Sequence, residues 1–146
     1  YYGEFREKYA EIPVYTSNEH VLPELMKNNL VVIGNDQDKM IKEILKDERV
    51  KLLVEEVRNK IKKEIVALFI KIPNIYDSNK KILLVLISRI EGMEKFKNEN
   101  VIKSKFMPPF YDKDLMRSDA VVLTEQGIYR CDFSADWKIS EFAAVI

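Results

Sequence analysis

The sequence predicts an α/β fold, a three-layer sandwich in which helices cover both faces of a mainly parallel sheet, with a small C-terminal β-hairpin. Three observations support this prediction. Residues 30–33 are apolar at every position, and the run stops at Gly34. Strand and helix patterns then alternate as far as residue 97. After a polar, proline-containing stretch, residues 120–133 carry the alternation of a hairpin.

Residues 30–33 are the predicted central strand of the sheet. A strand that is buried on both faces shows an unbroken apolar run, as in parallel sheets that helices cover on either side. A helix is expected directly after it, because apolar residues recur there at helical spacing, and Asn35 or Asp36 is its expected N-cap. These apolar residues are Met40, Ile41, Ile44 and Leu45.

Further elements follow the same alternation. Pro23 begins a short helix that ends near Lys27, because proline at the first turn of a helix loses no hydrogen bond. Residues 50–63 favour a helix, with two short strands as the alternative. Strands are predicted at 65–72 and 81–88, separated by a loop of turn-forming residues. The order strand, helix, strand predicts a Rossmann-like arrangement.

The chain divides into three predicted segments. Residues 1–97 form the α/β unit, which we expect to be truncated at its N-terminus because the chain opens on Tyr1-Tyr2-Gly3. Residues 98–118 form a strap or linker, because the paired prolines within Phe106–Tyr111 exclude a regular helix. Residues 119–146 form a hairpin appendage that packs on the same domain.

Charge and composition exclude several classes of function. The 146 residues include 24 Lys and Arg against 24 Asp and Glu, so the net charge is zero. Dedicated nucleic-acid-binding proteins usually show a positive excess, so we expect no nucleic-acid partner. We expect no membrane partner either, because no apolar run approaches the roughly 18 residues of a spanning helix.

Residues for nucleophilic or metal chemistry are few. Cys131 is the single cysteine and His20 the single histidine, which excludes a disulfide framework within the chain and a structural zinc site built from cysteines. Cys131 lies on the apolar face of a predicted strand and is interpreted as a buried, inert thiol. Ser88 and His20 lack the Gly-x-Ser-x-Gly pattern of a nucleophile elbow. We therefore predict no catalytic residue.

One crevice is the candidate ligand site, because ligands of open α/β sheets bind at the carboxyl ends of the strands. We expect it at the ends of strands 30–33 and 82–88. Its predicted residues are Gly34, Asn35, Asp36, Ser88, Glu91 and Gly92. A phosphate is disfavoured there, because there is one glycine in place of a glycine-rich pattern and acids follow in the first helical turn.

A metal site is the alternative at the same place. Asp36, Asp38 and Glu91 all follow predicted strands, and carboxylates at strand ends can hold magnesium. Glu91-Gly92 together with Asp112-Lys113-Asp114 is similar to the toprim nuclease and topoisomerase domain, but the residues before Asp112 make a poor strand. Solvated surface acids are the favoured interpretation, and we predict neither a bound metal nor a cofactor.

Two stretches resemble a known family. Residues 29–39 are similar to a strand-Gly segment in the accessory α/β region of secreted prolyl-oligopeptidase-like hydrolases, and Pro73-Asn74, strand 81–88 and Glu91-Gly92 resemble a later loop, strand and turn of that region. The likeness covers residues 5–97 at most. In that family the region is not catalytic, so the resemblance implies an accessory module and assigns no catalytic residue here.

Together these observations predict a non-catalytic accessory or protein-interaction module. Its expected partner is another protein or another domain of a parent chain. The alternative is a small-molecule or metal-binding domain, or a small enzyme, with its site in the crevice described above.

Overall fold

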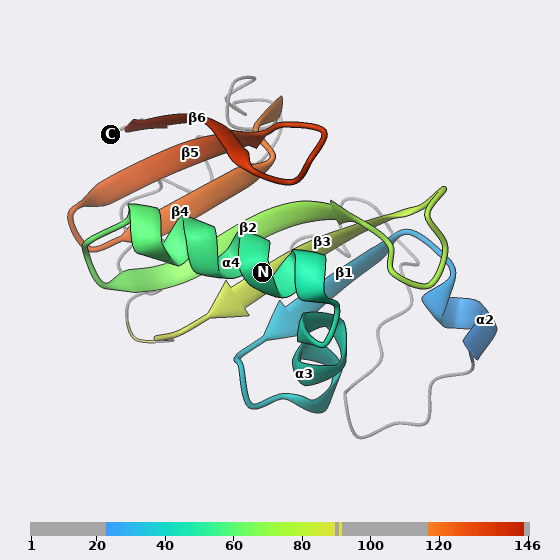
Figure 1. Cartoon of the computed structure of the whole chain (residues 1–146). Helices are drawn as coiled ribbons and strands as arrows, with labels where there is room; N and C mark the ends of the chain where they lie inside the picture. The colour runs from blue at the N-terminus through green and yellow to red at the C-terminus, as the bar shows by residue number, and fades with distance from the viewer. Residues whose placement is uncertain (1–22, 90, 92–116, 145–146) are drawn as a thin grey trace, which may run out of the picture.

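The computed structural model describes residues 23–89, 91 and 117–144 of the chain. Its main feature is a six-stranded sheet with the strand order β1-β3-β2-β4-β5-β6 (Figure 1). The strands are β1 (Leu30–Gly34), β2 (Ile65–Pro73), β3 (Lys81–Ile87), β4 (Ala120–Thr124), β5 (Gly127–Phe133) and β6 (Ile139–Ala144).

The two longer described helices lie on one face of this sheet (Figure 1). They are α3 (Lys39–Leu45) and α4 (Glu48–Lys60), and a short helix, α2 (Pro23–Met26), precedes β1. The carboxylate of Asp47 caps α4 by accepting hydrogen bonds from the backbone N–H groups of Arg49 and Val50. The residues between 50 and 63 therefore form the predicted helix and not the alternative strands. The N-cap of α3 is Asp38, not Asn35 or Asp36 as expected.

The predicted three-layer sandwich with a mainly parallel sheet is wrong. Within the described residues the sheet is mixed, and only β1 and β3 run parallel. The physical reason lies in the connection between β2 and β3. Residues 74–80 are far too few for the crossover of a dozen or more residues that a parallel neighbour requires, so the chain turns back as an antiparallel hairpin.

The predicted C-terminal hairpin forms but is not an appendage. β4 and β5 pair antiparallel through the turn at Glu125-Gln126, and β4 also pairs with β2, with Phe69 opposite Val121. The hairpin thereby continues the same sheet. β6, which the sequence pattern did not predict, adds a sixth strand beside β5.

Among the described strands, β1 lies at an edge of the sheet and is not its central strand. It pairs with β3 in parallel, with Leu30 opposite Ile82 and Gly34 opposite Leu86, and β3 separates it from β2. The unbroken apolar run therefore does not reflect burial on both faces. The side chains of Val31 and Ile33 are each 63% exposed.

The main core lies between the sheet and the helices. It combines Ile41 and Ile44 of α3 with the buried face of α4 and with alternate residues of β2, β3 and β4. A second, smaller group of buried apolar residues lies on the opposite face of the sheet. It consists of Val66, Ala67, Val121, Leu123 and Ile128. Both faces of β4 are thus buried, and so are both faces of β2 near its start.

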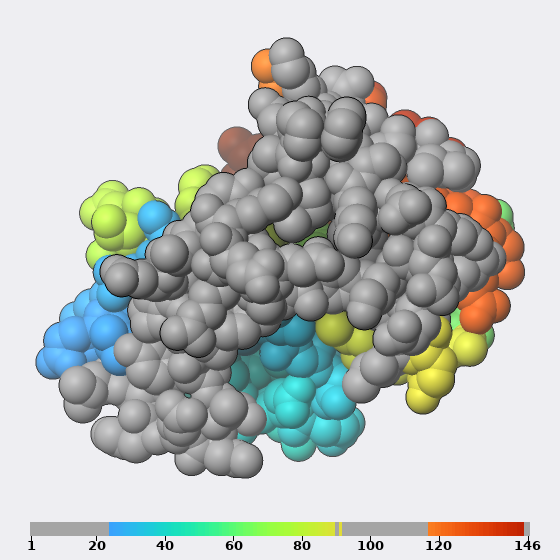
Figure 2. All heavy atoms as spheres, turned by 180° about the vertical axis from the view of Figure 1, so that it is seen from behind, coloured from blue at the N-terminus to red at the C-terminus, as the bar shows by residue number. Residues whose placement is uncertain are grey.

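Further predicted helices and strands are present in the structure. The short helix after Pro23, the strands at 65–72 and 81–88 and the hairpin at 120–133 are confirmed. The proline-containing stretch 106–111 lies outside the described residues. Seen from behind, α2 and the start of β1 (blue) lie at one end of the molecule and the β4–β5 region (orange) at the other (Figure 2). No described helix is long and apolar enough to cross a membrane.

Candidate functional site

The carboxyl ends of β1 and β3 meet at one end of the sheet, as the predicted crevice requires. Gly34 is opposite Leu86 in the parallel register, and Ser88 follows shortly after β3 ends. Ser88 and Glu91 are exposed, and Gly92 lies outside the described residues. The structure thus brings Gly34 and Ser88 to the same end of the sheet, while the binding of a ligand there stays a prediction.

Gly34 has a structural role in the turn after β1. A Cβ atom at this position would overlap the carboxylate of Asp38. That carboxylate accepts a hydrogen bond from the backbone N–H of Asn35 at 2.8 Å, and the side-chain oxygen of Asn35 accepts one from the N–H of Gln37 at 2.8 Å. The glycine, the amide and the acid therefore build the turn that leads into α3.

Ion pairs surround the predicted crevice, and one of them involves a predicted acidic residue, Asp36. Asp36 Oδ1 lies 3.0 Å from Arg58 Nη2 on α4, in an exposed ion pair of the kind that contributes at most about 1 kcal/mol. Arg89, next to Ser88, lies 3.0 Å from Glu64 and 3.1 Å from Glu125. The hydrogen bond that Arg89 donates to the Glu64 carboxylate, together with the negative charge of Glu64, raises the pKa of Arg89. These surface pairs tie loops to neighbouring elements.

Metal ligands do not cluster in the part of the chain that the structure describes. No group of three or more His, Cys, Asp and Glu side chains in residues 23–89, 91 and 117–144 is placed to hold a metal ion. Asp112 and Asp114, which entered the comparison with the toprim domain, lie outside these residues.

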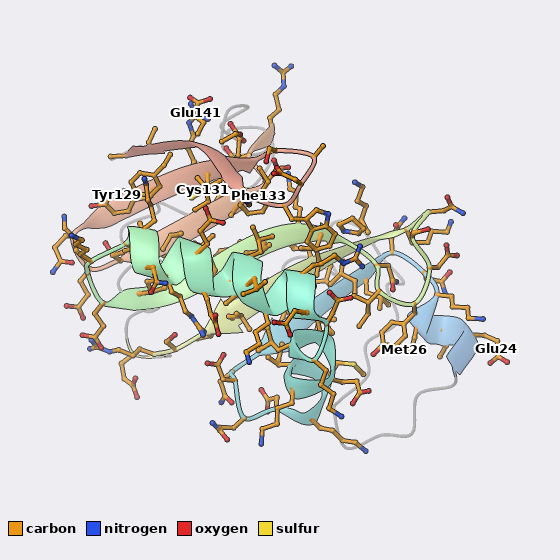
Figure 3. All side chains as sticks on the ribbon, in the orientation of Figure 1. Glu24, Met26, Tyr129, Cys131, Phe133 and Glu141 are labelled. Atoms are coloured by element: carbon orange, nitrogen blue, oxygen red, sulfur yellow. The ribbon has the colours of Figure 1, made fainter. Side chains whose placement is uncertain are left out.

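Cys131 is buried and free, as the sequence predicted. It lies between Tyr129 and Phe133 on the face of β5 that contributes to the main core (Figure 3). Burial, followed by the nearby charge of Asp132, raises the pKa of its thiol to about 11. A buried thiol with a high pKa is a poor nucleophile, because the thiolate is the reactive form.

We expect the Cys131 thiol to react at pH 8 at least about 100-fold more slowly in the folded chain than in the urea-unfolded chain. The pKa rises from 9.0 to about 11, and two pKa units reduce the thiolate fraction about 100-fold. Ellman's reagent with and without urea measures both rates. Equal rates would contradict the buried position.

The same pKa shift predicts a loss of stability at high pH. The unfolded thiol loses its proton near pH 9 and the folded one near pH 11, so between these values the unfolded state binds fewer protons. The contribution of Cys131 to the free energy of unfolding should therefore fall as the pH rises from 9 to 11. Cys131→Ala lacks this contribution and is the matched control.

Aromatic and basic side chains meet where α4 packs against β5 and β6. The rings of Tyr129 and Phe142 stack with centroids 5.5 Å apart. Lys63 Nζ donates to the Tyr129 hydroxyl at 2.8 Å, and Lys60 Nζ lies 5.9 Å from the Phe142 ring. Basic residues beside aromatic ones also occur in nucleic-acid sites. Here these contacts hold the end of α4, and the residues that follow it, against the sheet.

The most unusual surface feature of the described residues is the edge strand β1. Large apolar side chains with more than half their surface exposed occur at Val31, Ile33 and Leu52. Two of the three are neighbours on one face of β1, and no residue of β1 carries a charge. Beside them lies a depression of about 310 Å³, lined by residues 29–31 and 81–83 and by Lys71.

The sequence did not reveal this surface. The apolar run was the signal that marked β1, but an apolar run does not reveal whether a strand has one neighbour or two. The depression lies at the amino-terminal ends of β1 and β3, opposite the predicted crevice.

Comparisons with family models, with curated proteins and with solved structures gave no match to this chain.

Proposed function

We propose that this chain is a non-catalytic interaction module that binds a protein partner, or another domain of a longer chain, through the edge strand β1. The observation that carries the proposal is the 63% exposure of both Val31 and Ile33 on an uncharged strand. Exposed apolar residues that occur singly need no explanation, whereas neighbouring ones on a sheet edge are typical of a binding surface.

The strand at the other edge of the described sheet, β6, differs from β1 in its protection against pairing. Edge strands are usually protected against pairing by charges, prolines or β-bulges. β6 has such protection, because Glu141 projects from it to an ion pair with Arg130 at 3.0 Å (Figure 3) and its register with β5 shifts between Asp132 and Phe133. β1 has neither a charge nor a proline, and its register with β3 is regular.

Strand addition is the binding mode that such an edge supports. An extended partner segment continues the sheet through backbone hydrogen bonds, and its alternate side chains contact the strand that it joins. On β1 those contacts would be with Val31 and Ile33, next to the apolar depression at the start of the strand. Strand addition requires no titratable group. The low reactivity expected of the buried Cys131 thiol is therefore consistent with it.

Site-specific photo-crosslinking tests the proposal. A photoreactive residue is placed at Ile33, and in a matched control at Leu52, which is similarly exposed but lies on α4. In extract of the source organism we expect a discrete adduct from position 33 only. Excess wild-type chain should compete for it, and the double variant Val31→Lys, Ile33→Lys should not.

The captured protein, once produced in pure form, should then bind the wild-type chain at least about 10-fold more tightly than the double variant. Loss of two apolar contacts of about 1 kcal/mol or more each makes this a lower bound. Adducts of equal yield at positions 33 and 52, or adducts that the wild-type chain does not reduce, would contradict the proposal.

A second candidate function is a ligand site at the carboxyl ends of β1 and β3. The observation that favours it is the parallel pairing of these strands, which brings Gly34 and Ser88 to the same end. A thermal-shift screen with nucleotides and divalent metals distinguishes the two functions. A ligand at 100 times its dissociation constant stabilises the folded state by about 2.7 kcal/mol, which gives a clear rise in Tm.

A further inference from the structure

We infer that β6 is a detachable strand, which contacts with α4 hold closed and whose release uncovers Cys131 while the rest of the sheet stays folded. The inference concerns the edge of the described sheet opposite β1 and does not depend on the proposed function. Three features of the described residues carry it. These are the shallow burial of β6, the polar contacts that hold it, and the strained backbone of the turn before it.

β6 is buried less deeply than the strand beside it. It lies at the edge of the described sheet and pairs there with β5 (Figure 1). None of its six residues, 139–144, is fully buried, whereas Ile128 and Cys131 of β5 are. Its apolar side chains Ile139 and Phe142 pack against the main core but are only partly buried. Segments with few buried apolar contacts open at a lower free energy than the rest of a fold.

A row of charged side chains on α4 holds β6 and the turn before it. Arg49, Glu56 and Lys60 are seven and four positions apart, so they share one face of the helix. Their partners, in the same order, are the Trp137 ring at 4.7 Å, the backbone N–H of Ile139 at 3.3 Å and the Phe142 ring at 5.9 Å. Arg49 and Lys60 are exposed, so water competes for their contacts and each contributes little to stability.

The turn between β5 and β6 holds Trp137 in a strained backbone conformation. Among the described residues, Trp137 is the one non-glycine residue with a positive φ, at 62°. Its N–H donates to the Ser134 carbonyl at 3.0 Å, and the Ser134 N–H donates to the Lys138 carbonyl at 2.8 Å. This is the pattern of a type I turn followed by a left-handed residue, where glycine is usual because a side chain is disfavoured. The closed turn therefore depends on the contacts of the Trp137 ring with Arg49 and the main core.

Cys131 reports the release of β6. Phe142 lies directly opposite Cys131 in the antiparallel register, so both side chains are on the same face of the sheet. With β6 in place, Cys131 is 0% exposed. Release of β6 removes this neighbour, while β4 keeps its place on the other side of β5 with Ala120 opposite Cys131. The thiol then becomes accessible without unfolding of the whole chain.

Labelling of Cys131 in the full chain with Ellman's reagent, at urea concentrations below the unfolding transition, tests the inference. The dependence of the logarithm of the labelling rate on urea reports how much surface opens before the thiol reacts. Release of β6 alone should give a slope between about one-tenth and one-half of the slope m for global unfolding. A slope outside this range would overturn the inference. A larger value means that the thiol is exposed by global unfolding, and a smaller one means that no strand is released.

Two variants of α4 test the row of contacts. Arg49→Ala removes the contact with the Trp137 ring and should speed the labelling of Cys131 at least about 3-fold, because loss of a cation–π contact favours the open state. Lys51→Ala is the matched control, since Lys51 is an exposed basic residue in the same helix and should change the rate less than about 2-fold. If the two variants were labelled equally fast, the role of the row would be overturned.

Two variants of the turn test the strain. Trp137→Ala and Trp137→Gly both remove the ring, but only alanine keeps a side chain in the disfavoured backbone conformation. The alanine variant should therefore be labelled at least about 3-fold faster than the glycine variant, because strain in the closed turn favours release. Equal labelling rates of the two variants would overturn the part that strain plays in the release.

Discussion

Leu53→Ala is expected to lower the free energy of unfolding by about 3 kcal/mol. The Leu53 side chain is 1% exposed and packs in the main core between α4 and the sheet. Truncating a buried leucine loses both transfer free energy and packing, because the surrounding side chains close the cavity only in part. Urea unfolding at 25 °C, followed by the midpoint and the slope m, measures the change.

Leu52 provides the matched control for this prediction. It is the same residue type, one position earlier in the same helix, and is 55% exposed. Because helix propensity changes equally at both positions, Leu52→Ala should alter the free energy of unfolding by less than about 0.5 kcal/mol. Equal effects at the two positions would show that α4 does not pack against the sheet in the orientation described.

Asn74→Asp is expected to destabilise the fold by about 3 kcal/mol or more. Asn74 is 2% exposed, and its Nδ2 donates to the carbonyl oxygens of Met26 at 2.8 Å and Asn28 at 2.7 Å. Its Oδ1 accepts a hydrogen bond from the backbone N–H of Tyr76 at 2.7 Å. This one side chain thus links the end of α2 to the loop between β2 and β3. Aspartate would place one carboxylate oxygen against two carbonyl oxygens and leave a charge unpaired.

Two further variants complete this test. Asn74→Ala removes the three hydrogen bonds without adding a charge and should cost about 2 kcal/mol. Asn79→Ala, in the same loop, changes an exposed residue and should cost less than about 0.5 kcal/mol. Urea midpoints compare all three. If Asn74 and Asn79 variants were equally stable, the buried link between α2 and the loop would be disproved.

Local sequence patterns predicted most of the helices and strands, because these elements depend on residues that lie close together in the sequence. The helical spacing and charged composition of residues 50–63 predicted α4, and the alternation of Tyr129, Cys131 and Phe133 predicted both β5 and the burial of the thiol. The turn-rich residues between β2 and β3 were recognised as a loop. Their small number already required an antiparallel hairpin, so this part of the topology was available from the sequence.

Strand order was not available from the sequence. The pairing of β2 with β4 joins residues about 50 positions apart, and nothing in either segment specifies that partner. β6 was missed because Ser140 and Glu141 interrupt its apolar pattern, although Phe142 stacks on Tyr129 in the folded chain.

The exposed surface of β1 could not be predicted from the sequence, because its exposure also depends on the order of the strands. The apolar run of β1 is compatible with a strand buried on both sides, and only the neighbour count distinguishes a central strand from an edge. The crevice residues, in contrast, were predicted from strand ends. In the structure β1 and β3 are parallel neighbours, and Asp36 and Arg58 form an ion pair nearby.

Residue-resolved hydrogen exchange of the β1 amides tests most directly whether β1 is an open edge that pairs with another strand. In dilute solution, the amides of β1 that point away from β3 should exchange rapidly, while the amides of β3, which has a partner on both sides, should be strongly protected. The outward amides of β1 should gain protection as a captured partner is added. Strong protection of every β1 amide at the lowest concentration would contradict the account, because the edge would already be covered.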